Sequence, residues 1–313
     1  MPMIIVRVRG RLGNQLFQYA AGRCLALERG TDLYLDLLHF KHKTYDCHLG
    51  IFQTRFEVAS PLRIGPLILT ENMMVVMEPA LRLAPLMRLN HRLVDGLLQN
   101  APHLNPRRRR VNEDRTIIGY DAKAWREIDP WRGDLYLDGF WQSERCFAKH
   151  ADAMREDLRL RGPLRDKVIK MRSTLQGGDS VSVHIRRGDY ASQTGVTNTL
   201  GCCGVDYYAR AAARAKTELG HPRFFVFSDD IEWTKHNLDF EAPTTYVSGE
   251  FADFEEMHLM SACQGHIIAN STFSWWAAWL DEKEDKFVIG PERWAVSEKL
   301  TALDNFPSAW IKV

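Results

Sequence analysis

The sequence carries almost no net charge and no long hydrophobic run. Its 313 residues include 41 Lys+Arg against 40 Asp+Glu, so no global field attracts a nucleic-acid backbone or an anionic membrane. No stretch reaches the roughly 20 apolar residues of a membrane span. The opening MPMIIVRVRG has too short an apolar run for a signal peptide, and no basic region precedes it. We therefore expect a cytoplasmic protein, with peripheral contact at the inner face of a membrane as an alternative.

Several motifs of metal and nucleophile chemistry are also missing. The cysteines form no C-x-x-C pair, and Cys202 and Cys203 are sequence neighbours, so neither a zinc site nor a disulfide framework is indicated. H-E-x-x-H, G-x-S-x-G and D-x-D are absent. We expect no metal and no cofactor, and a diphosphate ligand would be neutralised by arginine and a helix dipole.

The first half begins with a strand, a glycine turn and a helix. Residues 3–9 predict a strand, Gly10 to Gly13 a turn, and the following apolar periodicity a helix that stops at Gly30. A strand at 33–37 completes a β-α-β unit, which favours a parallel sheet. Prolines interrupt residues 60–118, where we expect short helices and loops. A strand at 134–141 leads through Ser143 as N-cap into a helix toward residue 160.

The second half repeats the alternation of strands and helices. Strands are predicted at 181–190, 224–230, near 245, at 266–270 and at 287–290, with helices between them. The predicted fold class is α/β, with two Rossmann-like domains facing a cleft. We expect an N-terminal acceptor-binding domain at 1–148, a donor-binding domain at 149–290, and a tail at 291–313 packing back across the cleft.

Polar groups gather where the strand VSVHIRRGDY ends. Alternation places Val181, Val183 and Ile185 on one face and Ser182, His184 and Arg186 on the other. Ligands bind at the carboxyl ends of parallel strands, and adjacent arginines there can grip a pyrophosphate. Candidates at this end are His184, Arg186, Arg187 and Asp189. A surface Arg–Asp ion pair is the competing interpretation.

Three other segments place polar groups at strand ends. Asn270 to Ser274 precede a Trp-rich helix, whose N-terminus could bind phosphate. Capping alone would also explain Ser271, Thr272 and Ser274, and core packing explains Trp275 and Trp279. Gly10 to Gln15 allow close backbone approach but match neither the P-loop nor the dinucleotide fingerprint. Ser228 and Asp229 end another strand, where Asp229 or Asp230 could simply cap the next helix.

Five segments together resemble the bacterial α-1,2-fucosyltransferases of glycosyltransferase family 11: GRLGNQLFQYAAGR, YLDGFWQSERCF, VSVHIRRGDY, FFVFSDDIEW and HIIANSTFSWWAAWL. The resemblance implies a GT-B-like fold and metal-independent, inverting transfer of L-fucose from GDP-L-fucose to the 2-hydroxyl of a terminal β-galactose. It implies that Arg186 and Arg187 bind the diphosphate, supported by His184 and Asp189. Ser271, Thr272, Phe273 and Ser274 match the loop at the phosphates, and Glu256 lies where a carboxylate could reach the nucleotide.

Two positions depart from the family's pattern. Arg11 stands where the first turn usually has a second glycine, which resembles the turn of protein O-fucosyltransferases. GCCG at 201–204 replaces a Cys followed by Ser or Pro, and these cysteines receive no catalytic role. The remaining donor-binding candidates are Asn270, Gly10, Arg11, Gly13, Asn14, Gln15, Ser228 and Asp229.

A catalytic base is expected from the N-terminal domain, across the cleft from the donor. Asp36 and Asp46 are the candidate bases, and His39, His48, Trp141 and Gln142 are the candidate acceptor contacts. The acceptor would be a galactose-terminated glycan, free or lipid-linked. A fucosyltransferase of another linkage or acceptor and a non-catalytic GDP-sugar or glycan-binding protein are the alternatives. Arg107 to Arg110 form too local a patch to predict nucleic-acid binding, but they could touch an anionic membrane.

Overall fold

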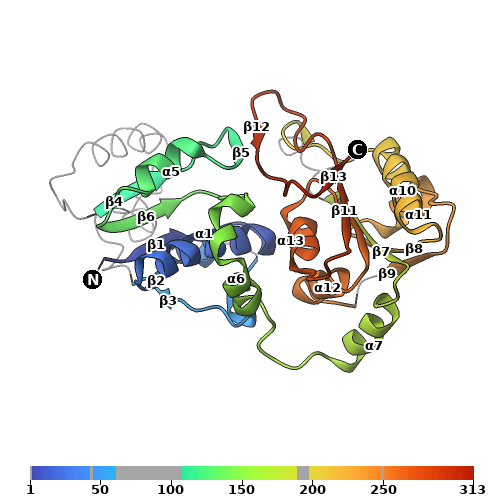
Figure 1. Cartoon of the computed structure of the whole chain (residues 1–313), viewed down its shortest axis with the longest axis horizontal. Coiled ribbons are helices and arrows are strands. Elements are labelled where there is room, and N and C mark those ends of the chain that lie inside the picture. Colours follow the sequence, from blue (N-terminus) through green and yellow to red (C-terminus); the bar gives the residue numbers. More distant parts are fainter. Residues whose placement is uncertain (1, 43–44, 61–107, 189–196, 248–249) are drawn as a thin grey trace.

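The computed structural model describes residues 2–42, 45–60, 108–188, 197–247 and 250–313. Within them, two parallel β-sheets lie on either side of a central pair of helices, α1 (Leu12–Arg29) and α13 (Thr272–Leu280) (Figure 1). No helix in these residues is long and apolar enough to cross a membrane. The arrangement is an α/β fold of the GT-B-like type that the sequence predicts.

The first sheet has the strand order β3-β2-β1-β6-β4. Its strands are β1 (Ile4–Arg7), β2 (Leu33–Asp36), β3 (Glu57–Val58), β6 (Asp134–Asp138) and β4 (Arg108–Asn112). Helix α1 crosses from β1 to β2 and ends at Gly30, whose φ of 59° is the left-handed conformation favoured by glycine. Strand order reverses between β1 and β6, so a crevice for ligands is expected outside the carboxyl ends of these two strands.

The second sheet has the order β13-β11-β10-β7-β8-β9, and all its pairings are parallel. Its strands are β7 (Ser180–Ile185), β8 (Arg223–Ser228), β9 (Thr244–Val247), β10 (Gly265–Ile267), β11 (Phe287–Gly290) and β13 (Ile311–Lys312). Among the described residues, α13 connects β10 to β11, and the other helices that accompany this sheet are α7 (Asp166–Leu175), α10 (Val205–Leu219), α11 (Ile231–Asn237) and α12 (Asp253–Met260). This order is that of a dinucleotide-binding sheet, with the reversal between β7 and β10.

The C-terminal residues touch both halves. Strand β13 extends the second sheet beside β11, whereas β12 (Thr301–Leu303) pairs with β5 (Ile117–Gly119) of the first half. The predicted boundaries at 148/149 and 290/291 lie outside both sheets' strands, and they stay predictions.

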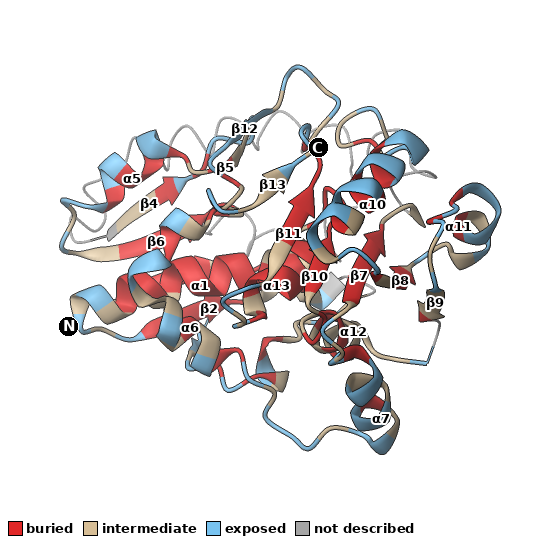
Figure 2. Cartoon of the chain, turned by 45° about the vertical axis from the view of Figure 1, so that its right-hand side comes forward, coloured by how far each residue is buried: buried red, intermediate tan, exposed pale blue. Residues whose placement is uncertain are grey.

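Aromatic side chains fill the interface between α1 and α13. Phe17 packs against Trp275 and Trp276, with ring centroids 4.6 and 4.9 Å apart, and Phe147 stacks on Trp276. All four side chains are buried, and Figure 2 shows the burial concentrated on these helices and the strands beside them. The predicted core role of Trp275 and Trp279 is thereby confirmed, since both are at most 2% exposed.

Two local predictions were wrong. Residues 108–119 form β4 and β5 instead of helices or loops, because Arg110 pairs with Asp138 and Arg109 stacks on Trp131. The predicted helix after Ser143 is broken into η5 (Glu144–Cys146), η6 (Ala148–His150) and α6 (Ala151–Asp157). Ser143 caps η5, as expected. The remaining elements are α5 (Ala122–Ile128), η1 (Leu38–His42) and η2 (Leu49–Ile51). Most of residues 60–118, with Arg107, lies outside the described residues.

Candidate active site

The arginines after β7 are held by the two aspartates after β8. Asp229 accepts from the Arg186 guanidinium at 2.6 Å and from the Arg187 backbone N–H at 2.8 Å. The Arg187 side chain pairs with Asp230 at 3.3 Å and stacks 3.6 Å above the Trp233 ring. These contacts fix both arginines at the carboxyl end of β7, beside the reversal of the sheet. Asp189 lies outside the described residues.

His184 is buried on the face of β7 that turns toward α13. Its ring centroid lies 5.4 Å from that of Phe273, and its Nδ1 has no hydrogen-bond partner among the described residues. Burial, together with the nearby Arg186 charge, lowers the pKa of His184 to about 3. The imidazole is therefore neutral near pH 7, and it can bind a ligand group but cannot supply charge.

The N-terminus of α13 lies at the carboxyl end of β10. Ser271 is the N-cap, since its Oγ accepts the N–H of Phe273. Asn270 donates to the carbonyls of Leu200, Gly201 and Trp294, so its amide ties down neighbouring loops. Ser274 is buried with its hydroxyl on the Ser271 carbonyl. A helix start at this position carries the backbone N–H groups and positive dipole that suit a phosphate.

The N-terminus of α1 meets that of α13 across the two halves. Asn14 Oδ1 accepts from Thr272 Oγ1 at 3.2 Å and from Gln142 Nε2 at 2.9 Å. Gly13 faces Thr272 closely enough that a Cβ would lie 2.6 Å from its backbone. Gly10 has a φ of +80°, which only glycine adopts easily. The first turn thus brings the N-terminus of α1 into contact with the N-terminus of α13.

Other members of the first turn have distinct positions. Gln15 is buried and donates to the carbonyls of Gly10 and Asp46, while it accepts the N–H of His48. Arg11 is exposed at the N-cap of α1. Gln15 therefore organises the loop that carries His48, and the Arg11 side chain lies at the surface beside the start of α1.

Carboxylates of α12 and of the residue that follows β8 lie close enough to influence one another. Burial, and then the charges of Asp253 and Asp229, raise the pKa of Glu256 to about 7. His48 of the first half lies 3.0 Å from Asp253. The predicted nucleotide contact Glu256 is thus close to Asp229 and to a link between the halves.

A cavity of about 530 Å³ opens between the halves. Asn14, Gln142 and Glu113 line it from the first half, and Thr272, Asn270 and Trp294 line it from the second. The cavity therefore opens at the start of α13, where Thr272 bonds to Asn14 of the first turn.

A scan of protein families supplies the decisive comparison. The model described as Glycosyl transferase family 11 matches residues 3–313. The chain belongs to glycosyltransferase family 11. This result agrees with the resemblance found in the sequence, and it covers both sheets and the C-terminal strands.

Individual relatives of this family 11 chain include bacterial and mammalian proteins. An Escherichia coli protein named alpha-1,2-colitosyltransferase is 31% identical over all of this chain and 99% of its own length. The Homo sapiens galactoside alpha-(1,2)-fucosyltransferase 1 is 29% identical over 50% of this chain and 48% of its own. A solved structure of Arabidopsis thaliana FUT1 in complex with GDP covers 96% of this chain and 72% of its own, with 10% identity and a TM-score of 0.51. At that identity the likeness concerns the fold alone.

The two predicted bases differ in burial in this family 11 protein: Asp36 is buried and Asp46 is exposed. Asp36 is 1% exposed, and its oxygens accept from the Tyr136 hydroxyl at 2.7 Å and from the Leu38 N–H. It therefore holds β2 to β6. Asp46 is exposed on the loop before His48. Among the described residues, neither of these two carboxylates lines the cavity between the halves.

The predicted acceptor contacts divide in the same way. Gln142 lines the cavity and bonds to Asn14, and His48 bridges to Asp253. His39 lies 3.2 Å from the Tyr45 hydroxyl. Trp141 is fully buried against Trp125, so its ring supports the turn after β6.

Ser228 accepts from the N–H of Asp230, which itself caps α11, as the capping alternative predicts.

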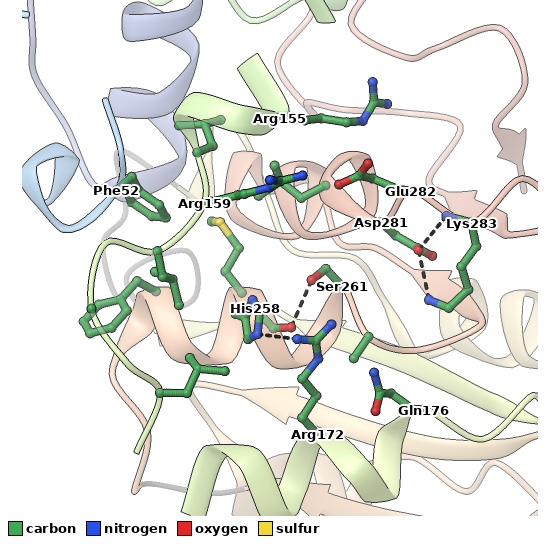
Figure 3. Close-up of a pocket in the computed structure, with 18 residues that line it drawn as sticks. Phe52, Arg155, Arg159, Arg172, Gln176, His258, Ser261, Asp281, Glu282 and Lys283 are labelled. Carbon is green, nitrogen blue, oxygen red and sulfur yellow. Dashed lines mark hydrogen bonds and ion pairs between the residues drawn. The ribbon is translucent and has the colours of Figure 1, made fainter. Parts of the chain in front are cut away.

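A second cavity, of about 620 Å³, lies at the other end of α13 (Figure 3). Its basic side chains already have partners: Arg172 bonds to His258, Lys283 to Asp281, and Arg155 stacks on Trp279. Because these cations are internally paired and remote from the helix start, this cavity is not part of the candidate active site.

Sequence reasoning missed Glu113. Glu113 directly follows β4, whose run of arginines did not predict a strand. It is 7% exposed and lines the cavity between the halves. Because β4 was not predicted as a strand, no sequence pattern marked the carboxylate that follows it as a site residue. Its position became visible only when β4 paired with β6.

Proposed function

We propose that this protein transfers L-fucose from GDP-β-L-fucose to the 2-hydroxyl of a terminal β-galactose, with inversion and formation of an α-1,2 linkage. The observation that carries the proposal is that Arg186 follows β7 and the start of α13 follows β10, the two adjacent strands at the reversal of the second sheet. Thr272 at that helix start bonds to Asn14 of the first turn. Membership of family 11 and the names of the colitosyl and fucosyl relatives support it.

The chemistry requires positive charge at the leaving group. When the anomeric carbon separates from GDP, negative charge grows on the β-phosphate, and fixed cations or dipoles there lower the barrier. Arg186 and Arg187 would supply guanidinium charge, and the N–H groups at Ser271 to Ser274 would supply the helix dipole. With this charge available, we propose that the reaction needs neither a divalent metal nor a cofactor.

The acceptor would enter the cavity between the halves. Gln142 and Asn14 line it with amide groups, and amides suit the hydroxyl groups of a sugar. We propose a galactose-terminated glycan, either a lactose-type oligosaccharide or an O-antigen repeat carried on lipid. The lipid-linked form would bring the protein to the inner face of a membrane.

One observation favours a second donor. The relative that matches this chain from end to end is named a colitosyltransferase, not a fucosyltransferase. Colitose differs from fucose by lacking one hydroxyl group, so a small change in the sugar pocket could exchange the two. A GDP-colitose donor with the same α-1,2 linkage is therefore the second candidate.

An assay that compares the two donors in separate incubations tests the proposal. Purified protein is incubated with GDP-fucose or GDP-colitose, with and without lactose and with EDTA throughout, and released GDP is measured. Lactose-dependent release from GDP-fucose supports the proposal. Higher turnover with GDP-colitose supports the second candidate. Binding of both donors with no release for any galactoside would instead indicate a non-catalytic binding protein, and loss of activity with EDTA would contradict metal independence.

A further inference from the structure

Glu113 lies in the wall of the cavity between the halves. It comes directly after β4, and its side chain is almost fully buried. Asn14 and Thr272, at the starts of α1 and α13, line the same cavity. A carboxylate in this position shares the acceptor's space with the helix start that would hold the donor phosphates.

Backbone groups of the turn after β6 fix the Glu113 carboxylate. Oε1 accepts the N–H of Trp141 at 3.0 Å, and Oε2 accepts the N–H of Phe140 and, at 3.1 Å, that of Trp141 as well. Trp141 has a φ of +55°, a strained conformation for a bulky residue that persists only when neighbours enforce it. Gly139 is part of the same fit, since a Cβ there would lie 2.5 Å from Glu113 Cβ.

The surroundings give this carboxylate an unusual affinity for protons. Burial raises the pKa of Glu113 to about 7, against the two N–H donors that lower it. The titratable groups that face it are Asp121 at the start of α5, Arg9 after β1 and the Cys146 thiol of η5. General bases work best when their pKa lies near the operating pH.

We propose that Glu113 is the general base that takes the proton from the attacking hydroxyl of the acceptor. This role rests on the proposed function. The hydroxyl oxygen forms a bond to the anomeric carbon of the donor sugar, and the bond from that carbon to the β-phosphate oxygen breaks. Its electron pair leaves with GDP, and the hydroxyl proton goes to the Glu113 carboxylate. Oε1 accepts a single N–H and retains a lone pair for that proton, because a carboxylate offers about four acceptor positions, two on each oxygen.

Other carboxylates near the cavity fit the role less well. Among the described residues that line it, the second acid is Asp114, which is exposed and accepts from Thr116. Asp36 is buried and does not line the cavity, since its oxygens accept from the Tyr136 hydroxyl and the Leu38 N–H. The exposed Glu127 on α5, which does not line the cavity either, serves as a matched control.

The test compares Glu113→Gln with Glu127→Gln. Gln keeps an acceptor oxygen for the turn but cannot take a proton. We expect kcat to fall on the order of 10²- to 10⁴-fold for Glu113→Gln, with the dissociation constant of GDP and the melting temperature near those of the wild type. Glu127→Gln should keep wild-type kcat. If Glu113→Gln keeps wild-type kcat, or if it loses GDP binding and thermal stability in proportion to kcat, Glu113 is not the base.

The pH profile separates a base from a structural support. Wild-type kcat should decline below about pH 7, and the same decline should be present in Glu113→Asp, which keeps a carboxylate, and absent in Glu113→Gln. This readout survives even where Glu113→Gln folds poorly. A wild-type kcat without an acidic limb between pH 6 and 8 overturns the inference. Wild-type protein with no transfer from any GDP-sugar would instead contradict the proposed function.

Discussion

Gly13 at the start of α1 lies directly against Thr272 at the start of α13. A Cβ on Gly13 would lie 2.6 Å from both the backbone carbon and the hydroxyl oxygen of Thr272. The residues flanking this contact are Asn14, which accepts from the Thr272 hydroxyl, and Phe273, which packs against His184. The glycine therefore sets the distance between the first turn and the donor side of the site.

Gly13→Ala should force α1 away from α13. Two of the three opposing atoms, Thr272 C and Phe273 N, belong to the backbone and cannot move aside as a flexible side chain would. Overpacking of this kind costs about 1–3 kcal/mol. We expect a lower melting temperature and a higher KM for the donor, measured by calorimetry and initial rates. Gly178→Ala is the control, since nothing lies within 4 Å of a Cβ there. Equal behaviour of the two variants would show that the contact is not limiting.

Arg186→Ala should remove charge from the leaving group. The expected loss is on the order of a hundredfold in kcat, or about 3 kcal/mol of transition-state stabilisation. The Arg186 and Asp229 side chains are only 17% and 26% exposed, so the melting temperature of the variant is measured beside kcat. Arg223→Ala removes an arginine paired with Asp179 at the opposite end of β8, and it should keep wild-type kcat. Wild-type turnover in Arg186→Ala would exclude a role at the diphosphate.

Glu256→Gln should stabilise the protein at alkaline pH. The pKa of Glu256 is raised to about 7 in the folded state, so the folded protein binds this proton more tightly than the unfolded chain does. The free energy of unfolding therefore falls as pH rises from about 4.5 to about 7. Glutamine removes this loss, and we expect a gain of about 1–3 kcal/mol at pH 8 with little change at pH 4.5.

Urea unfolding at the two pH values measures this difference. The exposed Glu298 supplies the control, and Glu298→Gln should change stability by less than about 0.5 kcal/mol at either pH. A Glu256→Gln protein that is equally destabilised at both pH values would contradict the account, because it would indicate a lost contact and not a relieved charge.

The elements with local signals could be predicted from the sequence. Hydrophobic periodicity and the stop at Gly30 identified α1, and FVIG identified β11 with its bounds. Strand alternation placed Val183 and His184 on opposite faces, and the structure puts Val183 in the core with α10 while His184 faces Phe273. These features depend on neighbours in sequence, which is why patterns reveal them.

Features that depend on distant partners could not be predicted. The arginine-rich β4 is a strand because it pairs with β6 and because Asp138 neutralises Arg110. The left-handed Trp141 depends on Glu113, which is 28 residues away. The bridge from His48 to Asp253 joins the two halves. In each case the partner is remote in sequence and carries no motif.

The product of the reaction tests the central proposal most directly. Protein, GDP-fucose and lactose are incubated with EDTA, and the linkage of the product is determined by NMR. The account predicts fucose joined through an α linkage to the 2-hydroxyl of galactose. Fucose attached to any other hydroxyl, or attached with a β linkage, would contradict it.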